Sequence, residues 1–318
     1  MMLSSLFIIH YPNNCQKKEN FMLTSQGISF IVPAYNEAEA ICETLNKLYH
    51  VLSQQSLPYE IILVNDGSND ETQICAASVD NIKIIQHPVC IGYGNSIKTG
   101  IRASKFNWIG IIDADGSYSI DGLPLLLNEM IKGYDMVIAS RANLNEIDST
   151  PKKFFRGIFK KIIHVLNDKR IEDPNSGFRI FKKDLSLELM PFLCGNFSFT
   201  TSFTILASGL DYFISYVPLT YHKRVGKSKV RHLRDSIQAL QLIIQGITFF
   251  NPLKYYIILS LLTIFFVAIP AFILGVFNFN LLSIVYLSTG IFSSIMIGIA
   301  GLGDIIRISA IKLQNKLL

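Results

Sequence analysis

Charge is missing from one long stretch of this sequence. The 318 residues include 29 Lys or Arg and 24 Asp or Glu, yet none of these lies between Lys254 and Asp304. Tyr255 to Phe277 and Leu281 to Leu302 each approach the roughly 20 apolar residues with which a helix spans a bilayer. The sequence therefore excludes an ordinary soluble enzyme. It predicts two membrane-spanning helices, joined as a hairpin by residues 278–280.

Paired cysteines are also lacking. The five cysteines are scattered, odd in number and never spaced as Cys-x-x-Cys, which excludes a disulfide framework and a zinc site and fits a reducing compartment. Lys254 precedes the apolar stretch, and Arg307, Lys312 and Lys316 follow it. Because basic flanks stay in the cytosol, we expect an integral membrane protein with its N-terminal domain on the cytosolic side, as in a bacterial inner membrane.

Two phosphate-binding signatures are absent. The chain has no P-loop and no Gly-x-Gly-x-x-Gly after its first predicted strand, which excludes P-loop ATPases and Rossmann dehydrogenases. A glycine-rich turn over 92–96 follows the third predicted strand instead. Two interpretations of it stay open, a tight turn that starts a helix and a direct contact to phosphate.

Strands alternate with helices over the first half of the chain. Helical spacing follows Asn36 and recurs from the glycine turn to Ser104 and over Asp121 to Lys132. Short apolar runs predict five strands, at Gly27–Val32, Glu60–Val64, Ile82–Ile85, Asn107–Ile112 and Asp135–Ala139. This alternation predicts an α/β fold with a doubly wound, mainly parallel sheet.

Polar residues follow the ends of these strands. Glu37 comes after the first strand, Asp66 after the second, Asp113 and Asp115 after the fourth and Arg141 after the fifth. Ligands bind such sheets outside the carboxyl ends of the strands. We therefore expect a site for a nucleotide or nucleotide sugar at this edge, and no nucleic-acid partner.

Asp113 and Asp115 form an Asp-x-Asp pair directly after a buried strand. Two carboxylates without Cys or His suit Mg²⁺ or Mn²⁺, which completes its shell with phosphate oxygens and water. We interpret the pair as a metal clamp for a diphosphate. The alternative is a polar turn after a strand.

Three later segments are amphipathic or basic. Pro151 to Arg170 and Asp235 to Phe250 repeat apolar residues at helical spacing, the first with a cationic flank that includes Arg156. The first is expected to lie on the membrane surface, to pack on the domain core, or to do both, and the second is expected to lie along the membrane interface. His222 to Lys229 is a cationic loop, either a phosphate contact or a solvated charge run.

The chain is accordingly divided into four parts. Residues 1–26 form an extension, 27–230 the α/β domain, 231–252 an interfacial amphipathic helix and 253–318 the transmembrane hairpin with a basic tail.

Seven short motifs give the chain a resemblance to a known family. It resembles the family 2 glycosyltransferases of the dolichyl-phosphate mannose synthase and polyprenyl-phosphate glucosyltransferase type. The motifs occur in the family's order, as Val32-Pro33-Ala34-Tyr35-Asn36-Glu37, Asn65-Asp66-Gly67-Ser68-Asn69-Asp70, Asp113-Ala114-Asp115, Gly133-Tyr134-Asp135, Ser140-Arg141, Ser176-Gly177-Phe178-Arg179 and Arg224-Val225-Gly226-Lys227-Ser228-Lys229.

This resemblance implies a GT-A fold (Rossmann-like, with a mainly parallel sheet) and residue roles. The nucleoside pocket is expected to be lined by Pro33, Tyr35, Glu37 and Asp66. The donor diphosphate and its metal are expected at Asp113 and Asp115, which count with Arg141 as catalytic. The acceptor phosphate is expected among the cations Arg141, Arg156, Arg179, Arg224 and Lys229.

One departure from the family concerns the metal. Many mannose synthases carry Leu-Gln after the aspartates, whereas this chain has Gly116-Ser117-Tyr118, so neither a third ligand nor mannose is implied.

The resemblance implies inverting transfer of one sugar from a UDP- or GDP-hexose to a polyprenyl phosphate, undecaprenyl or dolichyl, at the membrane. A homo-oligomer is compatible with it. The alternatives are a processive synthase, a membrane glycosyltransferase with another acceptor, a sugar-1-phosphate nucleotidyltransferase and an inactive membrane scaffold with a GT-A fold. Against a processive synthase, the one tryptophan, Trp108, is not in the Gln-x-x-Arg-Trp motif usual there.

Overall fold

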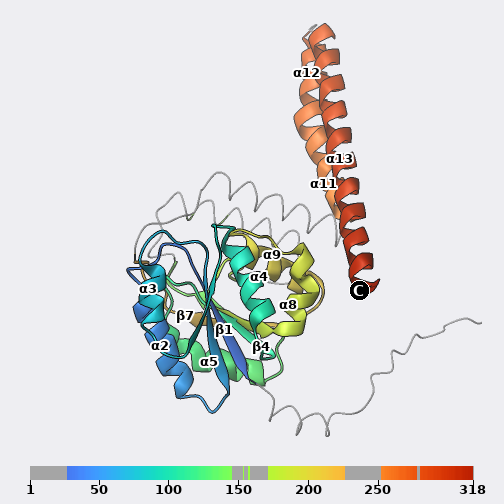
Figure 1. The fold of residues 1–318 in the computed structure, drawn as a ribbon. Helices are drawn as coiled ribbons and strands as arrows, with labels where there is room; N and C mark the ends of the chain where they lie inside the picture. Colours follow the sequence, from blue (N-terminus) through green and yellow to red (C-terminus); the bar gives the residue numbers. More distant parts are fainter. Residues whose placement is uncertain are drawn as a thin grey trace, which may run out of the picture.

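The five strands predicted from apolar runs lie together with two more, β6 and β7, in one sheet of the computed structural model. The structure describes residues 27–144, 153, 157, 171–225, 252–277 and 280–317. The spatial order is β3-β2-β1-β4-β6-β5-β7 (Figure 1). The strands are β1 (Ile28–Ala34), β2 (Tyr59–Asn65), β3 (Ile82–Gln86), β4 (Trp108–Ile111), β5 (Met136–Arg141), β6 (Arg179–Lys182) and β7 (Ile214–Leu219).

Most neighbouring strands are parallel, as expected from the alternation of strands and helices. β1 pairs in parallel with β2 and β4, β2 with β3, and β5 with β7. β6 is antiparallel to both β4 and β5. It starts at the sheet edge where β4 and β5 end, so the turn before it, residues 173–178, reaches the predicted site. The sequence predicts residues 173–179 as a turn that feeds a strand, which β6 confirms, but it does not predict the direction of that strand.

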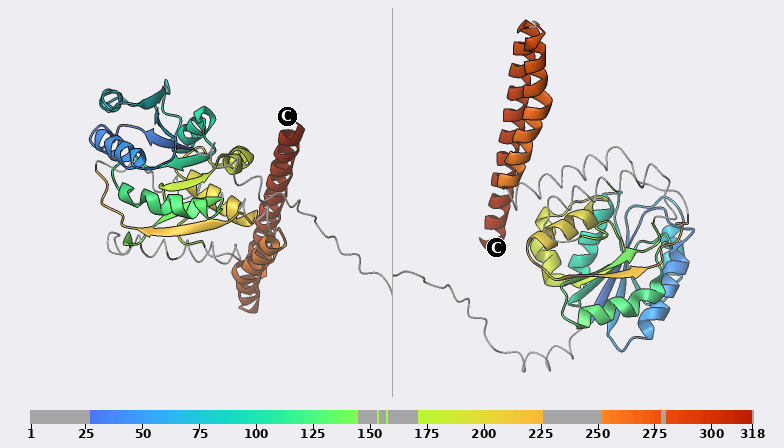
Figure 2. Two further views of the ribbon diagram at one scale, coloured as in Figure 1. Left: turned by 90° about the horizontal axis from the view of Figure 1, so that it is seen from below. Right: turned by 180° about the vertical axis from the view of Figure 1, so that it is seen from behind.

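Helices cover both faces of the sheet (Figures 1 and 2). One core contains the apolar residues of α2, α3 and α5, and the other those of α4, α8 and α9. The sequence of α2 explains why it packs on the sheet. Its apolar residues repeat at helical spacing and are all buried, namely Ile41, Leu45, Leu48 and Leu52. The helices are α2 (Ile41–Ser53), α3 (Thr72–Ala77), α4 (Tyr93–Ala103), η1 (Ile120–Gly122), α5 (Leu123–Ile131), α8 (Lys183–Leu189), η2 (Met190–Phe192) and α9 (Phe199–Gly209).

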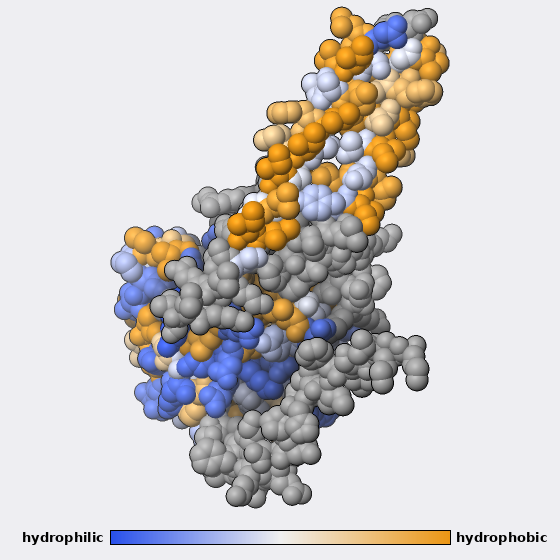
Figure 3. All heavy atoms as spheres, turned by 90° about the vertical axis from the view of Figure 1, so that its right-hand side faces the viewer, coloured by the Kyte–Doolittle hydropathy of each residue, from blue (hydrophilic) through white to orange (hydrophobic). Residues whose placement is uncertain are grey.

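The C-terminal segments form two long apolar helices, as predicted. Tyr256–Val276 and Asn280–Gly303 are long and apolar enough to cross a membrane, and apolar side chains cover their surface in Figure 3. The first consists of α11 (Pro252–Thr263), the π-helical η3 (Ile264–Ala268) and α12 (Ile269–Val276), and the second lies in α13 (Asn280–Leu317).

Polar contacts join the two apolar helices. Pro270 has no N–H to offer the Phe266 carbonyl four residues before it, and the Tyr286 hydroxyl of α13 donates to that carbonyl at 2.9 Å. Thr263 and Ser294 share a hydrogen bond of 2.8 Å between their hydroxyls. Because a carbonyl without a partner is costly in hydrocarbon, these contacts favour a paired hairpin over two separate helices.

Several predictions lie outside the described residues. They are the extension 1–26, the amphipathic segments 151–170 (apart from Lys153 and Gly157) and 231–251, and the side chains of Arg156 and Lys229.

Candidate active site

Asp115 is held by the turn that follows β4. Gly116 has φ +69, a left-handed conformation that glycine adopts without strain, and the chain folds back there. The Ser117 amide then donates to Asp115 Oδ1 at 3.1 Å, and the Ser117 hydroxyl donates to the same oxygen. Asp115 is 7% exposed, so its carboxylate is fixed at the sheet edge before any ligand arrives.

Asp113 lies in a niche made by two other motifs. Tyr93, the first residue of α4, donates its hydroxyl to Asp113 Oδ1 at 2.7 Å. On the other side is Gly177, where a Cβ atom would overlap the Asp113 carboxylate. The glycine of the Ser-Gly-Phe-Arg motif is therefore required by the aspartate of a different motif.

The two aspartates influence each other's charge. Burial, and next the neighbouring Asp115 carboxylate, raise the pKa of Asp113 to about 6. Such mutual repulsion is what a divalent cation between carboxylates relieves.

Arg224 links the aspartates to the first strand. Its Nη2 donates to Glu37 Oε1 at 3.2 Å, and its Nη1 lies 3.6 Å from Asp115 Oδ2. Its loop is fastened to the turn after β4, where the Val225 amide donates to the Asp115 carbonyl at 3.1 Å and the His222 amide to the Ser117 carbonyl at 2.7 Å. Glu37, Asp115 and Arg224, far apart in sequence, thus meet at one point.

The segment after β1 is tied to the segment after β2. The Asn36 amide donates to Ser68 Oγ at 2.9 Å, and the Glu37 amide to Thr72 Oγ1 at 2.8 Å. Pro33 is buried within β1, whereas Tyr35 and Glu37 are half-buried at its end. The two predicted nucleoside motifs therefore form one surface next to Glu37.

Asp66 departs from its predicted place on that surface. It is 3% exposed, and it accepts hydrogen bonds from the amides of Ile91 and Gly92, at 3.0 and 2.8 Å, and from His87 Nδ1, at 2.8 Å. Burial alone would raise the pKa of Asp66, but these hydrogen bonds lower it below its usual value. The structure places Asp66 beneath the 87–92 loop, as a support.

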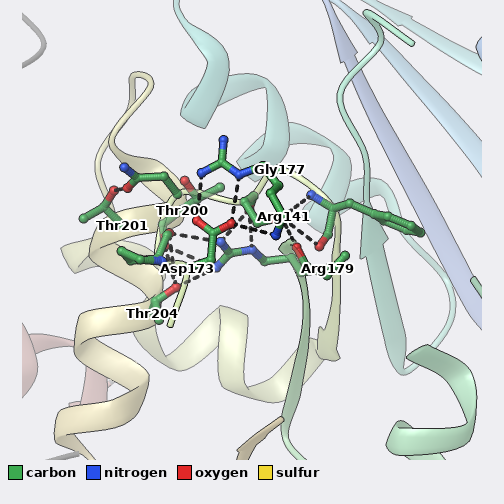
Figure 4. A network of polar contacts seen from close by, with 12 residues as sticks. Arg141, Asp173, Gly177, Arg179, Thr200, Thr201 and Thr204 are labelled. Carbon is green, nitrogen blue, oxygen red and sulfur yellow. Dashed lines mark hydrogen bonds and ion pairs between the residues drawn. The ribbon is translucent and has the colours of Figure 1, made fainter. Parts of the chain in front are cut away.

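Arg141 is engaged by Asp173. Its Nε donates to Asp173 Oδ2 at 2.8 Å and its Nη2 to Asp173 Oδ1 at 2.7 Å, a two-pronged ion pair shown in Figure 4. The guanidinium also lies 5.4 Å from the centre of the Tyr221 ring. Arg141 is at the predicted edge, but in this conformation the protein supplies its anion.

Arg179 requires a correction. The sequence placed it with the cations for the acceptor phosphate, but the residue is completely buried (Figure 4). Its guanidinium donates to protein oxygens: the Ser176, Pro174 and Thr200 carbonyls and Thr204 Oγ1, at 2.6, 3.1, 3.2 and 2.8 Å. Arg179 thus joins the 173–177 turn, which carries Asp173 and Gly177, to α9.

The glycine-rich turn of residues 92–96 is packed against protein. Cβ atoms at Gly92 and Gly94 would overlap Asn196 and the Cys194 carbonyl, and the Asn95 amide donates to the Gly195 carbonyl at 2.9 Å. These glycines allow a close approach of two loops, so the tight-turn interpretation accounts for both of them.

Comparison with known proteins identifies the family. Residues 29–189, slightly more than half of the chain, match the Glycosyl transferase family 2 model. The chain belongs to glycosyl transferase family 2. This family 2 chain is 28% identical to a dolichyl-phosphate beta-glucosyltransferase of Dictyostelium discoideum, over 69% of this chain and 73% of the relative. It is 28% identical to a dolichol-phosphate mannosyltransferase of Pyrococcus furiosus, over 64% of this chain and 59% of the relative.

Three further relatives are matched over about half to two thirds of their length. The family 2 chain spans 66% of one dolichyl-phosphate beta-glucosyltransferase of Trichomonas vaginalis and 53% and 54% of two others. The structure of glucosyl-3-phosphoglycerate synthase from Mycobacterium tuberculosis, in complex with Mn²⁺, uridine-diphosphate-glucose and phosphoglyceric acid, gives a TM-score of 0.59 at 17% identity. The match covers 75% of this chain and 86% of the synthase, and it confirms the predicted α/β fold of GT-A type.

The Asp113 and Asp115 carboxylates of this family 2 chain fit a hard divalent cation. Their oxygens are the ligands that Mg²⁺ and Mn²⁺ prefer. Within the described residues, no three or more His, Cys, Asp or Glu side chains gather as a metal site. A cation here would therefore depend on diphosphate oxygens and water for the rest of its shell.

Three residues of this site were not assigned from the sequence. Asp173 and Gly177 lie in a segment that sequence analysis treated as a turn, and Tyr93 lies in the glycine-rich turn. The signal available was the glycine inside Ser-Gly-Phe-Arg, which indicates a close approach without saying to what.

Proposed function

We propose that the chain transfers a single sugar from a nucleotide-diphosphate hexose to a polyprenyl phosphate, with inversion and with a divalent metal. The observation that carries the proposal is the meeting of Asp113, Asp115, Glu37 and Arg224 at the carboxyl edge of a family 2 fold. The two candidate membrane helices and the dolichyl- and dolichol-phosphate acceptors of the relatives support a lipid acceptor.

On the donor side, Pro33, Tyr35 and Glu37 would line the nucleoside pocket, while Asp113 and Asp115 would hold Mg²⁺ or Mn²⁺. When bound, the cation would neutralise negative charge on the leaving diphosphate. Asp66 would act one layer below, by holding the 87–92 loop. The neighbour from M. tuberculosis, with Mn²⁺ and uridine-diphosphate-glucose in its structure, supports this donor chemistry by analogy of fold.

On the acceptor side, the nucleophile would be a phosphate monoester. Its second pKa near 6 leaves it mostly dianionic at pH 7, so no strong general base is needed. The difficulty is the approach of one anion to another. Arg224 and Arg141 are the described cations at this edge, and Arg156 and Lys229 would add to them; a planar guanidinium matches phosphate oxygens well.

The acceptor phosphate would have to compete for both arginines. Arg224 now contacts Glu37 and Asp115, and Arg141 contacts Asp173. The domain would work at the cytosolic face of the membrane, where both ends of the hairpin are expected.

The test is a product analysis. Membranes that contain the protein are incubated with undecaprenyl phosphate, Mn²⁺ and a panel of UDP- and GDP-hexoses, and the lipid product is weighed by mass spectrometry. We expect a gain of one hexose, absent with Asp115→Asn. A series of longer products would indicate a processive synthase. Absence of both product and donor hydrolysis with every donor would contradict an enzymatic role.

A further inference from the structure

We propose that Tyr93 is a positioning residue that fixes the Asp113 carboxylate for the metal. The inference rests on the proposed function, because it assumes that Asp113 binds the cation. Tyr93 lies in the glycine-rich turn of residues 92–96. This turn is not one of the seven motifs on which the resemblance to the family rests.

The first argument is the contact itself. The Tyr93 hydroxyl donates to Asp113 Oδ1 at 2.7 Å, a short bond of the kind that charged acceptors form. Gly177 closes the opposite side of the carboxylate. With a wall on one side and a donor on the other, rotation of the carboxylate about its last bond is restricted.

The second argument is that the Tyr93 side chain is itself held. Its neighbour Gly92 donates its amide to Asp66 Oδ2 at 2.8 Å. The Tyr93 ring stacks on Phe197, with centroids 5.8 Å apart and ring planes 16° apart. The buried Asp66 thus anchors the backbone, and an aromatic neighbour orients the ring.

The test is Mn²⁺ binding to the full chain in detergent, with UDP or GDP present to supply the diphosphate oxygens. It is measured from the electron paramagnetic resonance signal of free Mn²⁺, against a sample with the same nucleotide and no protein. Loss of a hydrogen bond to a metal ligand typically weakens metal affinity about 10- to 100-fold, and we expect Tyr93→Phe to fall in this range. In the transfer assay, the same variant should need more Mn²⁺ for half-maximal rate and regain most of its rate at saturating Mn²⁺. A purely structural defect would not be rescued in this way.

The chain offers a matched control. The Tyr212 hydroxyl donates to Glu188 Oε2 at 2.7 Å, also a tyrosine–carboxylate bond, but it joins residues of the α8 and β7 region. Tyr212→Phe should leave Mn²⁺ affinity within about twofold of wild type, since it removes no bond to a metal ligand. Phe197→Leu tests the stacking partner and should have a smaller effect than Tyr93→Phe.

Two failures are distinguishable. If wild type binds Mn²⁺, Asp113→Asn abolishes binding and Tyr93→Phe binds like wild type, the positioning role is wrong and the metal-dependent function stands. If wild type and Asp113→Asn bind Mn²⁺ equally, or neither binds it, the metal assignment fails and the role of Tyr93 fails with it.

Discussion

The acidic and basic sides of the candidate active site are built in opposite ways. On the acidic side, Asp113 accepts a hydrogen bond from Tyr93 and Asp115 accepts from Ser117, with Arg224 as a longer contact at 3.6 Å. On the basic side, Asp173 engages two nitrogens of Arg141, and four protein oxygens surround the buried Arg179.

This difference separates two uses of charge. The carboxylates keep lone pairs for a cation, and burial, and next the neighbouring Asp115 carboxylate, raise the pKa of Asp113. Arg141 and Arg179 have much of their donor capacity taken by the protein, because a buried cation without partners is costly. An arginine in a family motif can therefore serve the architecture of the site rather than a ligand.

The most damaging change on the acidic side should be Asp115→Asn. It removes the charge of one of the two proposed metal ligands with almost no change in the size of the side chain. Because metal stabilisation of a transition state contributes several kcal/mol, we expect transfer to fall about 1000-fold or more. Rates of purified variant and wild type on the same lipid acceptor check this. Near-normal turnover of Asp115→Asn would overturn the metal assignment.

Gly177→Ala should also disturb the acidic side, although Gly177 lies in the 173–177 turn that Arg179 joins to α9. The added methyl group would overlap the Asp113 carboxylate, which has to move. A misplacement of about 1 Å can cost about 100-fold in rate, and we expect a loss of that order. Gly303→Ala is the control, because a Cβ there meets nothing within 4 Å. Equal activity of the two variants would show that the niche around Asp113 is not needed.

The pH dependence of Mn²⁺ binding should report on Asp113. Its pKa is raised to about 6, so below pH 6 the carboxyl is protonated and the proton competes with the metal. Affinity should fall about tenfold between pH 6 and pH 5 and change little above pH 7. A midpoint near pH 4, the value of an ordinary aspartate, would contradict the combined effect of burial and of the Asp115 charge on Asp113.

The raised pKa of Asp113 also predicts how the stability of the metal-free protein depends on pH, and this trend is opposite to the trend in Mn²⁺ affinity. A group that is harder to ionise in the folded state stabilises that state only while it is protonated. The metal-free protein should therefore lose stability as the pH rises from about 4 to about 6, and Asp113→Asn should remove this loss. Thermal unfolding in EDTA across this range measures it.

The sequence predicted the sheet and the acidic side well, for a physical reason. Strand periodicity and the rule that parallel strands end at one edge place Glu37, Asp113 and Asp115 together without knowledge of any contact. The basic side depended on contacts between distant segments. Nothing near Arg179 in sequence shows that α9 closes over it, and nothing near Asp66 shows that the amides of Ile91 and Gly92 donate to it.

The smallest effect on catalysis is expected for Arg179→Lys, which tests whether the buried arginine is architectural. A lysine ammonium keeps the charge, but one nitrogen cannot reach all the oxygens that the guanidinium joins on the 173–177 turn and α9. Each buried acceptor left without a donor costs about 1–3 kcal/mol, and each kcal/mol lowers the melting temperature of a domain of this size by about 2–4 °C. We therefore expect the melting temperature to fall by roughly 5–10 °C, with less than about a threefold change in the KM for the lipid acceptor.

Arg224→Lys makes the reverse comparison, since the Arg224 side chain is 27% exposed and lies beside Glu37 and Asp115. It should raise the acceptor KM with little change in melting temperature. If Arg179→Lys raises the acceptor KM as much as Arg224→Lys does and melts like wild type, the buried arginine must turn toward the acceptor during the reaction, and the contrast between the two sides of the site is wrong.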